Sequence, residues 1–240
     1  MKYLLPVFCL CLAFAHPAFA ETVEEAEAEC QSYPNVPVNI TPRFDDPVYD
    51  YHHNLRDLQS LSHDPSHQVH GTHRGLTLGL TSYEPMMAFK VPMKGVKFSN
   101  GLACAHVEHV DVTVGYQNVV VYIPTEVPQG SCGFNEVMAH EQKHIAVNKR
   151  LLEKYLPIIQ EKLEAYLKLN GVFREQNADY AAKLLQDKLQ VIVNDVSSEM
   201  MNENQREQQL VDSPEEYRRV SATCNGQLTM TATQYYRTGK

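Results

Sequence analysis

Tryptophan is absent from this sequence of 240 residues, and glycine and proline are sparse, with eleven and thirteen copies. So few of either excludes a collagen-like or low-complexity chain. No apolar stretch reaches the roughly 20 residues that a membrane-spanning helix needs, so we expect no membrane span. With 43% hydrophobic and 21% charged residues, the composition is that of an ordinary globular protein.

Positive charge is also in short supply. Lysine and arginine total 21 against 29 aspartate and glutamate residues, which gives a formal net charge of −8. Nucleic-acid phosphates and anionic membrane surfaces attract proteins with clustered positive charge. We therefore expect no nucleic-acid partner.

The first twenty residues predict a cleaved signal peptide. Lys2 supplies the positive start, Leu4 to Ala15 form a short apolar run, and Ala18-Phe19-Ala20 fits a cleavage site before Glu21. The domain prediction is therefore a signal peptide over residues 1–20 and a single domain over residues 21–240. Export predicts a periplasmic or secreted protein.

Two of the six cysteines lie in this leader, and four remain for the mature chain. An even number of cysteines in an exported chain indicates disulfides, here with three possible pairings. We expect Cys104–Cys132, which would join a β-hairpin to the start of a helix, and Cys30–Cys224, which would join the two ends of the domain. The close CxxC spacing of a structural zinc site is absent.

The first half of the mature chain predicts a small sheet. The β-branched runs Val107–Val114 and Val119–Ile123 are separated by Gly115-Tyr-Gln-Asn118, a pattern typical of a β-hairpin. A short strand is expected at Pro47–Tyr51 and a short helix at Leu55–Leu61.

The second half predicts two long helices. Apolar residues recur at helical spacing over about 135–169 and again over about 174–210, with a turn at Asn170-Gly171 between them. Pro157 should kink or interrupt the first helix. Ser213-Pro-Glu-Glu216 then predicts an N-cap and a further short helix. The predicted fold class is α+β, with a small antiparallel sheet packed on a long antiparallel helical hairpin.

The first long helix carries the sequence His140-Glu-Gln-Lys-His144, an HExxH pattern. Residues four apart share one helix face, so both imidazoles can reach a single Zn²⁺. Glu141 can take a proton from a water molecule activated by that metal. Both histidines continue the apolar stripe of Val137 and Val147, so we expect them to face the core.

Catalytic zinc takes three protein ligands and leaves one position for water. The longer pattern HExxHxxGxxH does not supply the third, because Val147 and Arg150 occupy its glycine and final histidine positions. Folding the second helix back about residue 171 places residues 198 and 202 opposite the two histidines, and other carboxylates follow the helix end. The candidate third ligands are Glu199, Glu203, Asp212 and Glu215.

The order of these parts resembles an uncharacterised bacterial family of predicted secreted zinc-dependent proteases. The residues that carry the resemblance are Val48–Tyr51, Asn54–Leu58, Thr72–Leu78, Cys104, Ile123-Pro124 and, most specifically, His140–His144. The resemblance implies a zincin-like fold and a metallopeptidase-like domain.

That family tends to carry Tyr-Asp-x-x-Thr-x-His-Gly after its long helices. At the equivalent place Asp212 keeps the aspartate, while Glu215 and Tyr217 replace the threonine and the histidine. The resemblance therefore implies Asp212 as third metal ligand beside His140 and His144.

These features predict a zinc metallopeptidase in which Glu141 is the catalytic general base and Zn²⁺ the cofactor. Its substrate would be a peptide or protein, for example a peptidoglycan peptide. The substrate would lie as an added strand along the hairpin. The alternative is a non-catalytic envelope protein that binds zinc structurally or binds peptides.

A second group of histidines crowds one loop-rich stretch. It predicts either ordinary exposed loop residues or a metal-gathering loop. The members are His52, His53, His63, His67, His70 and His73.

Overall fold

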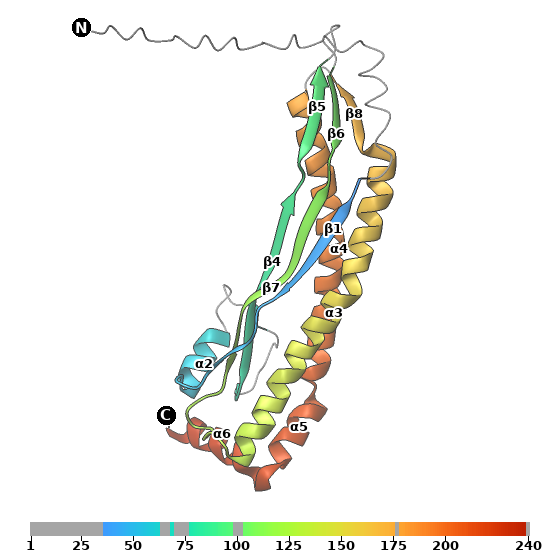
Figure 1. The fold of residues 1–240 in the computed structure, drawn as a ribbon. Coiled ribbons are helices and arrows are strands. Elements are labelled where there is room, and N and C mark those ends of the chain that lie inside the picture. Colours follow the sequence, from blue (N-terminus) through green and yellow to red (C-terminus); the bar gives the residue numbers. More distant parts are fainter. Residues whose placement is uncertain (1–35, 63–67, 70–76, 98–102, 176–177, 239–240) are drawn as a thin grey trace, which may run out of the picture.

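The computed structural model describes residues 36–62, 68–69, 77–97, 103–175 and 178–238. Two long helices run side by side along one side of an elongated molecule, and long strands run along the other (Figure 1). Within these ranges no helix has both the length and the apolar character needed to cross a bilayer. The predicted signal peptide and Cys30 lie outside the described residues.

The two predicted helices form an antiparallel pair. They are α3 (Cys132–Asn170) and α4 (Ala178–Val211). Helix α3 begins after Ser131, whose side chain accepts a hydrogen bond from the Phe134 amide. It continues through Pro157 without interruption. Pro157 lies at an exposed position, so the carbonyl that loses its partner there can be hydrated.

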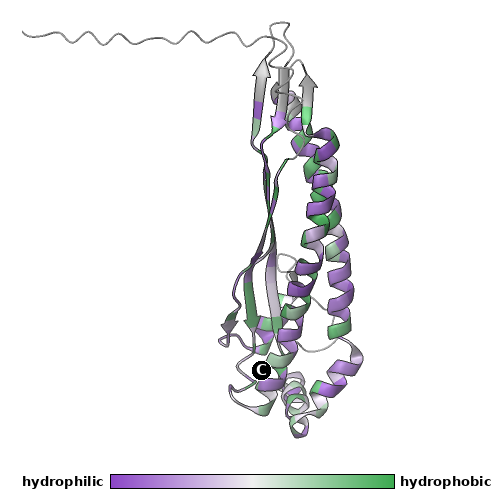
Figure 2. Cartoon of the chain, turned by 45° about the vertical axis from the view of Figure 1, so that its right-hand side comes forward, coloured by the Kyte–Doolittle hydropathy of each residue, from purple (hydrophilic) through white to green (hydrophobic). Residues whose placement is uncertain are grey.

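Each long helix has one buried face, and both carry bands of hydrophobic and hydrophilic residues (Figure 2). The apolar residues that recur along α4 form its buried face, with Leu185, Leu189, Val196 and Met200 buried. At the same spacing it continues into two buried polar residues. These are Asn204 and Gln208.

The connection between the helices is longer than the predicted two-residue turn. After Gly171 the chain forms strand β8 (Val172–Glu175), which pairs with β6 (Ala103–Val107). Helix α4 therefore begins several residues later than expected. As a result His144 faces Gln208 instead of residue 198.

The main sheet has five strands in the order β1-β7-β4-β3, with β2 also paired to β7. Strands β1 and β2 run parallel to β7, and β4 runs antiparallel to it. The prediction of a purely antiparallel sheet is therefore wrong, although the mixed α and β composition is confirmed. The bounds are β1 Val38–Phe44, β2 Val48–Asp50, β3 Gln68–Val69, β4 Leu80–Lys90 and β7 Val110–Tyr122.

The remaining elements lie near the two ends of the molecule (Figure 1). Strand β5 (Met93–Lys97) joins β6 and β8 in a second, three-stranded antiparallel sheet. Helix α2 (Leu55–Ser62) and strand β2 confirm the predicted short helix and short strand.

The predicted hairpin at residues 115–118 is wrong, because β7 passes through them as one strand. Gly115 allows a close approach between strands, since a Cβ there would lie 1.7 Å from the Arg43 carbonyl oxygen. Asn118 has a φ of 52°, and Tyr83 on β4 stands at a register shift opposite it. Together these features form a β-bulge.

The bulge changes which residues of β7 face the core. Before it Val110, Val112 and Val114 are buried, and after it the buried residues are Val119 and Val121. An ordinary strand keeps one parity along its length, and one extra residue reverses it. The insertion therefore keeps both valine runs in the core.

The chain ends in short helices beside the start of α3. They are α5 (Pro214–Ala222), the 3₁₀ turn η1 (Cys224–Gly226) and α6 (Gln227–Thr238). The predicted N-cap is confirmed, because the Ser213 hydroxyl accepts a hydrogen bond from the Glu216 amide.

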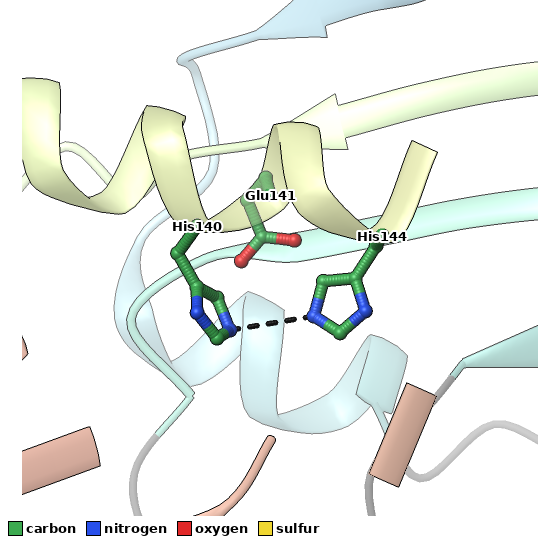
Figure 3. A group of neighbouring side chains, drawn as sticks. All are labelled: His140, Glu141 and His144. Carbon is green, nitrogen blue, oxygen red and sulfur yellow. Dashed lines mark hydrogen bonds between the residues drawn. The ribbon is translucent and has the colours of Figure 1, made fainter. Parts of the chain in front are cut away.

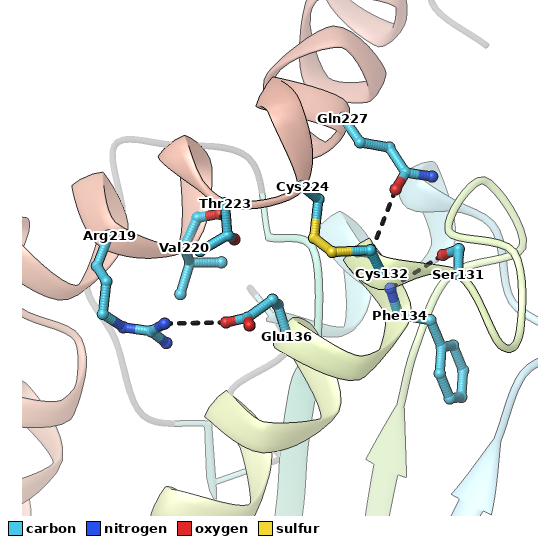
Figure 4. The surroundings of a disulfide bond; sticks show 10 residues. Ser131, Cys132, Phe134, Glu136, Arg219, Val220, Thr223, Cys224 and Gln227 are labelled. Atoms are coloured by element: carbon cyan, nitrogen blue, oxygen red, sulfur yellow. Dashed lines mark hydrogen bonds and ion pairs between the residues drawn. A yellow bond between two sulfur atoms is a disulfide. The ribbon is translucent and has the colours of Figure 1, made fainter.

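A disulfide joins Cys132 to Cys224, with the two Cα atoms 5.6 Å apart (Figure 4). Both predicted bridges are wrong, because each used one of these cysteines. Cys104 lies on β6 and pairs in register with Arg174, beyond the far end of α3. A helix of 39 residues is about 58 Å long, which separates Cys104 from Cys132.

Candidate metal centre

Helix α3 presents His140, Glu141 and His144 on its inner side (Figure 3). Their exposed fractions are 8%, 3% and 5%. The two Nε2 atoms are 3.3 Å apart, and each of the three residues offers a ligand atom within 4.8 Å of the others. This buried group could hold a metal ion.

Asp212, at the junction of α4 and α5, completes a triangle with the two histidines. Its Oδ1 lies 3.2 Å from His140 Nε2 and 3.3 Å from His144 Nε2. The Asp212 side chain is only 4% exposed. Two nitrogens from α3 and one oxygen from a residue 68 positions beyond His144 therefore converge on one point.

The triangle has the size that a tetrahedral metal requires. Zinc binds imidazole nitrogen at about 2.0–2.1 Å and carboxylate oxygen at about 2.0–2.2 Å, so its ligand atoms are separated by about 3.3–3.5 Å. The three observed separations are 3.2, 3.3 and 3.3 Å. An ion above this triangle would have three ligands and one remaining position.

A hydrogen bond to Gln208 orients His144. Its Nδ1 lies 2.5 Å from Gln208 Oε1, which can only accept, so Nδ1 donates and Nε2 is directed to the triangle. The Gln208 amide nitrogen donates to the His144 carbonyl and to Asn148 Oδ1, which fixes the amide orientation. Such partners orient the ligands in many metal sites.

A buried polar chain extends this support away from the histidines. Asn204 donates to Asn148 Oδ1 at 2.6 Å, and the Tyr83 hydroxyl donates to Asn204 Oδ1 at 3.3 Å. The sequence analysis did not predict this row of hydrogen-bonded side chains. Its signal was the presence of amides at helical spacing in buried stripes, Asn148 after His144 and Gln208 after Asn204.

Glu216 on α5 lies beside His140. Its Oε1 is 3.5 Å from His140 Nδ1, a buried atom that makes no hydrogen bond here, so the contact is an ion pair on the side where metal-binding histidines commonly have a carboxylate partner. Glu216 also accepts hydrogen bonds from Lys143 and from Arg219, whose guanidinium reaches Glu136 at 2.9 Å. The pKa of Glu216 falls to about 2, mainly because Arg219 hydrogen-bonds to it and Lys143 adds to the effect.

Strand β4 and the residue before it enclose the Glu141 carboxylate. The Thr81 hydroxyl donates to Glu141 Oε2 at 2.8 Å. At Gly79 a Cβ would lie 2.5 Å from Glu141 Oε1 and 2.5 Å from Val137 Cγ1, so only glycine leaves this oxygen its room. Neither Gly79 nor Thr81 was predicted as a site residue.

Tyr217 on α5 contacts two corners of the triangle, Asp212 and His140. Its hydroxyl donates to Asp212 Oδ1 at 3.0 Å, and its ring lies tilted against His140 with the centroids 6.0 Å apart. Burial of the hydroxyl and the carboxylates of Asp212 and Glu141 raise the pKa of Tyr217 well above its ordinary value. The phenol therefore remains a hydrogen-bond donor.

Opposing effects act on His144. Burial alone lowers its pKa, but the hydrogen bond to Asp212 and the charges of Glu141 and Asp212 outweigh burial and raise the pKa to about 9. In the metal-free protein His144 is therefore protonated at pH 7.

The carboxylates of the other candidate third ligands pair with side chains away from the two histidines. Glu203 accepts hydrogen bonds from Lys154 and from the Tyr155 hydroxyl. The ion-pair partner of Glu199 is Lys162, and that of Glu215 is Arg218.

Of the histidine-rich stretch, only His52 and His53 lie in the described residues. His53 contacts the carboxylates of Asp50 and Asp57 at 3.5 and 3.9 Å, and its side chain is 39% exposed. Among the described residues, the group of histidine and carboxylate side chains that could hold a metal ion is the one on α3.

Comparison with protein-family models, with curated proteins and with solved structures gives no match to this chain.

Proposed function

We propose that the protein is a zinc-dependent peptidase of the bacterial envelope, with His140, His144 and Asp212 as metal ligands. The observation that carries the proposal is the triangle of ligand atoms, whose edges of 3.2–3.3 Å suit tetrahedral zinc. The resemblance to predicted secreted zinc-dependent proteases and the predicted signal peptide agree with this function and location.

Glu141 is the proposed general base. Zinc, when bound, supplies Lewis acidity to a water molecule and to the scissile carbonyl. Glu141 accepts the proton of that water and delivers it to the leaving amine. The Thr81 hydroxyl donates to Oε2 of Glu141, and Gly79 leaves space beside Oε1. One carboxylate oxygen is therefore fixed by a hydrogen bond, and the other has space beside it for a proton donor.

The predicted mode of substrate binding needs revision. Strand β7 has β1 and β2 on one side and β4 on the other, so it has no open edge for an added strand over these pairings. The proposed substrate class remains peptide or protein.

The experiment is the Glu141→Gln variant, tested on casein and on a peptide library. We expect it to keep zinc and to lose hydrolysis. Glu153→Gln is the matched control, because Glu153 is an exposed glutamate on the same helix. Full hydrolysis by Glu141→Gln would refute the assigned role.

A structural metal site is the second candidate, and the burial of the ligands favours it. The side chains of His140, His144 and Asp212 are 10%, 6% and 4% exposed, which leaves little surface through which a peptide could reach the ion. Thermal melts with and without chelator distinguish the two functions. Unfolding on metal removal indicates structural zinc, whereas an intact fold without hydrolysis indicates the peptidase.

A further inference from the structure

We propose that Tyr217 is a positioning residue of the metal centre, which holds Asp212 in the ligating orientation and forms the outer wall of the site. This inference rests on the metal centre proposed above. It assigns a function to a side chain that stands where the resembling family has histidine.

The contact that supports this proposal is the hydrogen bond from the Tyr217 hydroxyl to one oxygen of Asp212, Oδ1. Tyr217 donates its hydroxyl hydrogen to Asp212 Oδ1, the same oxygen that lies 3.2–3.3 Å from both histidine Nε2 atoms. A carboxylate can rotate about its Cβ–Cγ bond, and a second hydrogen bond to the inward oxygen opposes that rotation. The phenol therefore selects the orientation in which Oδ1 faces the metal position.

Tyr217 lies on α5, a different helix from the one that carries the histidines. Asp212 closes the last turn of α4 with its amide bonded to the Gln208 carbonyl, and Tyr217 lies in the first turn of α5 with its amide bonded to the Ser213 carbonyl. The hydroxyl-to-carboxylate bond thus spans the junction of two helices. The Arg219–Glu136 ion pair joins α5 to α3, and the Cys132–Cys224 bridge joins the start of α3 to η1, which follows α5. These two links fix the helix that carries Tyr217 against the helix that carries the histidines.

Tyr217 also reaches from the surface to the site. The residue is 37% exposed, whereas the Asp212 side chain to which it bonds is 4% exposed. With a zinc–oxygen distance of about 2.0–2.2 Å and a hydroxyl-to-Oδ1 distance of 3.0 Å, the phenolic oxygen lies within about 5 Å of the metal position. The phenol therefore links the protein surface to the buried carboxylate, which is why we assign it as the outer wall of the site.

The test is the zinc affinity of Tyr217→Phe, measured by competition with a chromophoric chelator. Removing a partner of a metal ligand weakens binding by about 10–100-fold. Tyr236→Phe is the matched control, since Tyr236 is 67% exposed on α6, and we expect its zinc affinity to equal that of the wild type. Thermal melts of the metal-free proteins show whether either variant changes the fold.

A second measurement separates positioning from a general structural effect. Co²⁺ substitution gives a visible spectrum that depends on ligand geometry, so Tyr217→Phe should alter the absorption of the bound ion while Tyr236→Phe does not. We also expect Tyr217→Ala, which removes the wall, to speed loss of metal to the chelator beyond Tyr217→Phe. These readouts do not depend on peptidase activity.

The outcomes are distinct. A wild-type protein that binds no zinc refutes the metal centre itself. If the wild type binds zinc and Tyr217→Phe matches its affinity within twofold, with an unchanged Co²⁺ spectrum, the positioning function of Tyr217 is refuted and the metal centre stands.

Discussion

His144 on α3 and Gln208 on α4 meet through a 2.5 Å contact between Nδ1 and Oε1. This contact sets the register of the two long helices at the site, because the Gln208 amide also donates to the His144 carbonyl. Asp212 follows four residues later, just past the end of α4, and its amide donates to the Gln208 carbonyl. The alignment that orients His144 therefore also places Asp212, the proposed third ligand, beside it.

Asp212→Asn is expected to weaken zinc binding by about 10–100-fold or more, because the charge and one coordinating oxygen are lost. Glu199→Gln is the control, as its carboxylate pairs with Lys162. Chelator competition measures both. Equal affinities for the two variants would exclude Asp212 as a ligand.

Zinc affinity should depend on pH. The proton on His144, whose pKa is about 9 in the metal-free protein, must leave before Nε2 can bind zinc. From pH 7 to about 9 the apparent affinity should rise about tenfold per pH unit and then level off. Competition titrations give this slope, and calorimetry in buffers of different protonation enthalpy gives the proton released. A flat profile between pH 7 and 9 would contradict the assignment.

Thr81→Val should impair hydrolysis while zinc remains bound. The change keeps the shape of the side chain and removes the hydroxyl that donates to Glu141 Oε2, which leaves a buried carboxylate oxygen without that bond at a cost of about 1–3 kcal/mol. Thr81→Ser retains the hydroxyl and is the control. Steady-state kinetics should show a lower kcat for the valine variant, and equal kcat values in both would remove Thr81 from the mechanism.

Reduction of the Cys132–Cys224 bridge should lower the free energy of unfolding by about 2–5 kcal/mol, since the bridge closes a long loop of chain. Urea unfolding of the wild type and of Cys132→Ser/Cys224→Ser measures the loss. Peptide mapping without reductant should recover the Cys132–Cys224 peptide, and the same map tests whether Cys30 and Cys104 are joined. A Cys104–Cys132 peptide would contradict the structure.

Gly115→Ala should destabilise the main sheet. Its Cβ would fall 1.7 Å from the Arg43 carbonyl oxygen, so β1 has to move away from β7. We expect a loss of about 3 kcal/mol, the upper end for overpacked interiors. A urea midpoint equal to that of the wild type would show that β1 does not approach β7 this closely.

The sequence predicted the features that depend on neighbours along the chain. The α3 and α4 stripes and the Ser213 cap arise from residues three or four apart, whose contacts a helix itself determines. The predicted hairpin was wrong for a related reason. Gly115 and Asn118 favour a turn locally. In the sheet, Gly115 instead allows β1 to approach closely and Asn118 forms part of a bulge, and the neighbouring strands determine whether these residues form a turn or a continuous strand.

The HExxH spacing by itself placed His140, Glu141 and His144 together, because one turn of helix joins them. The environment of the site was decided by tertiary structure. Asp212, Gln208 and Tyr217 are far along the chain from the two histidines. Their position relative to α3 depends on the length of the β8 connection and on the Cys132–Cys224 bridge. Contacts between such distant residues follow from how whole elements pack, and no local spacing in the sequence encodes them.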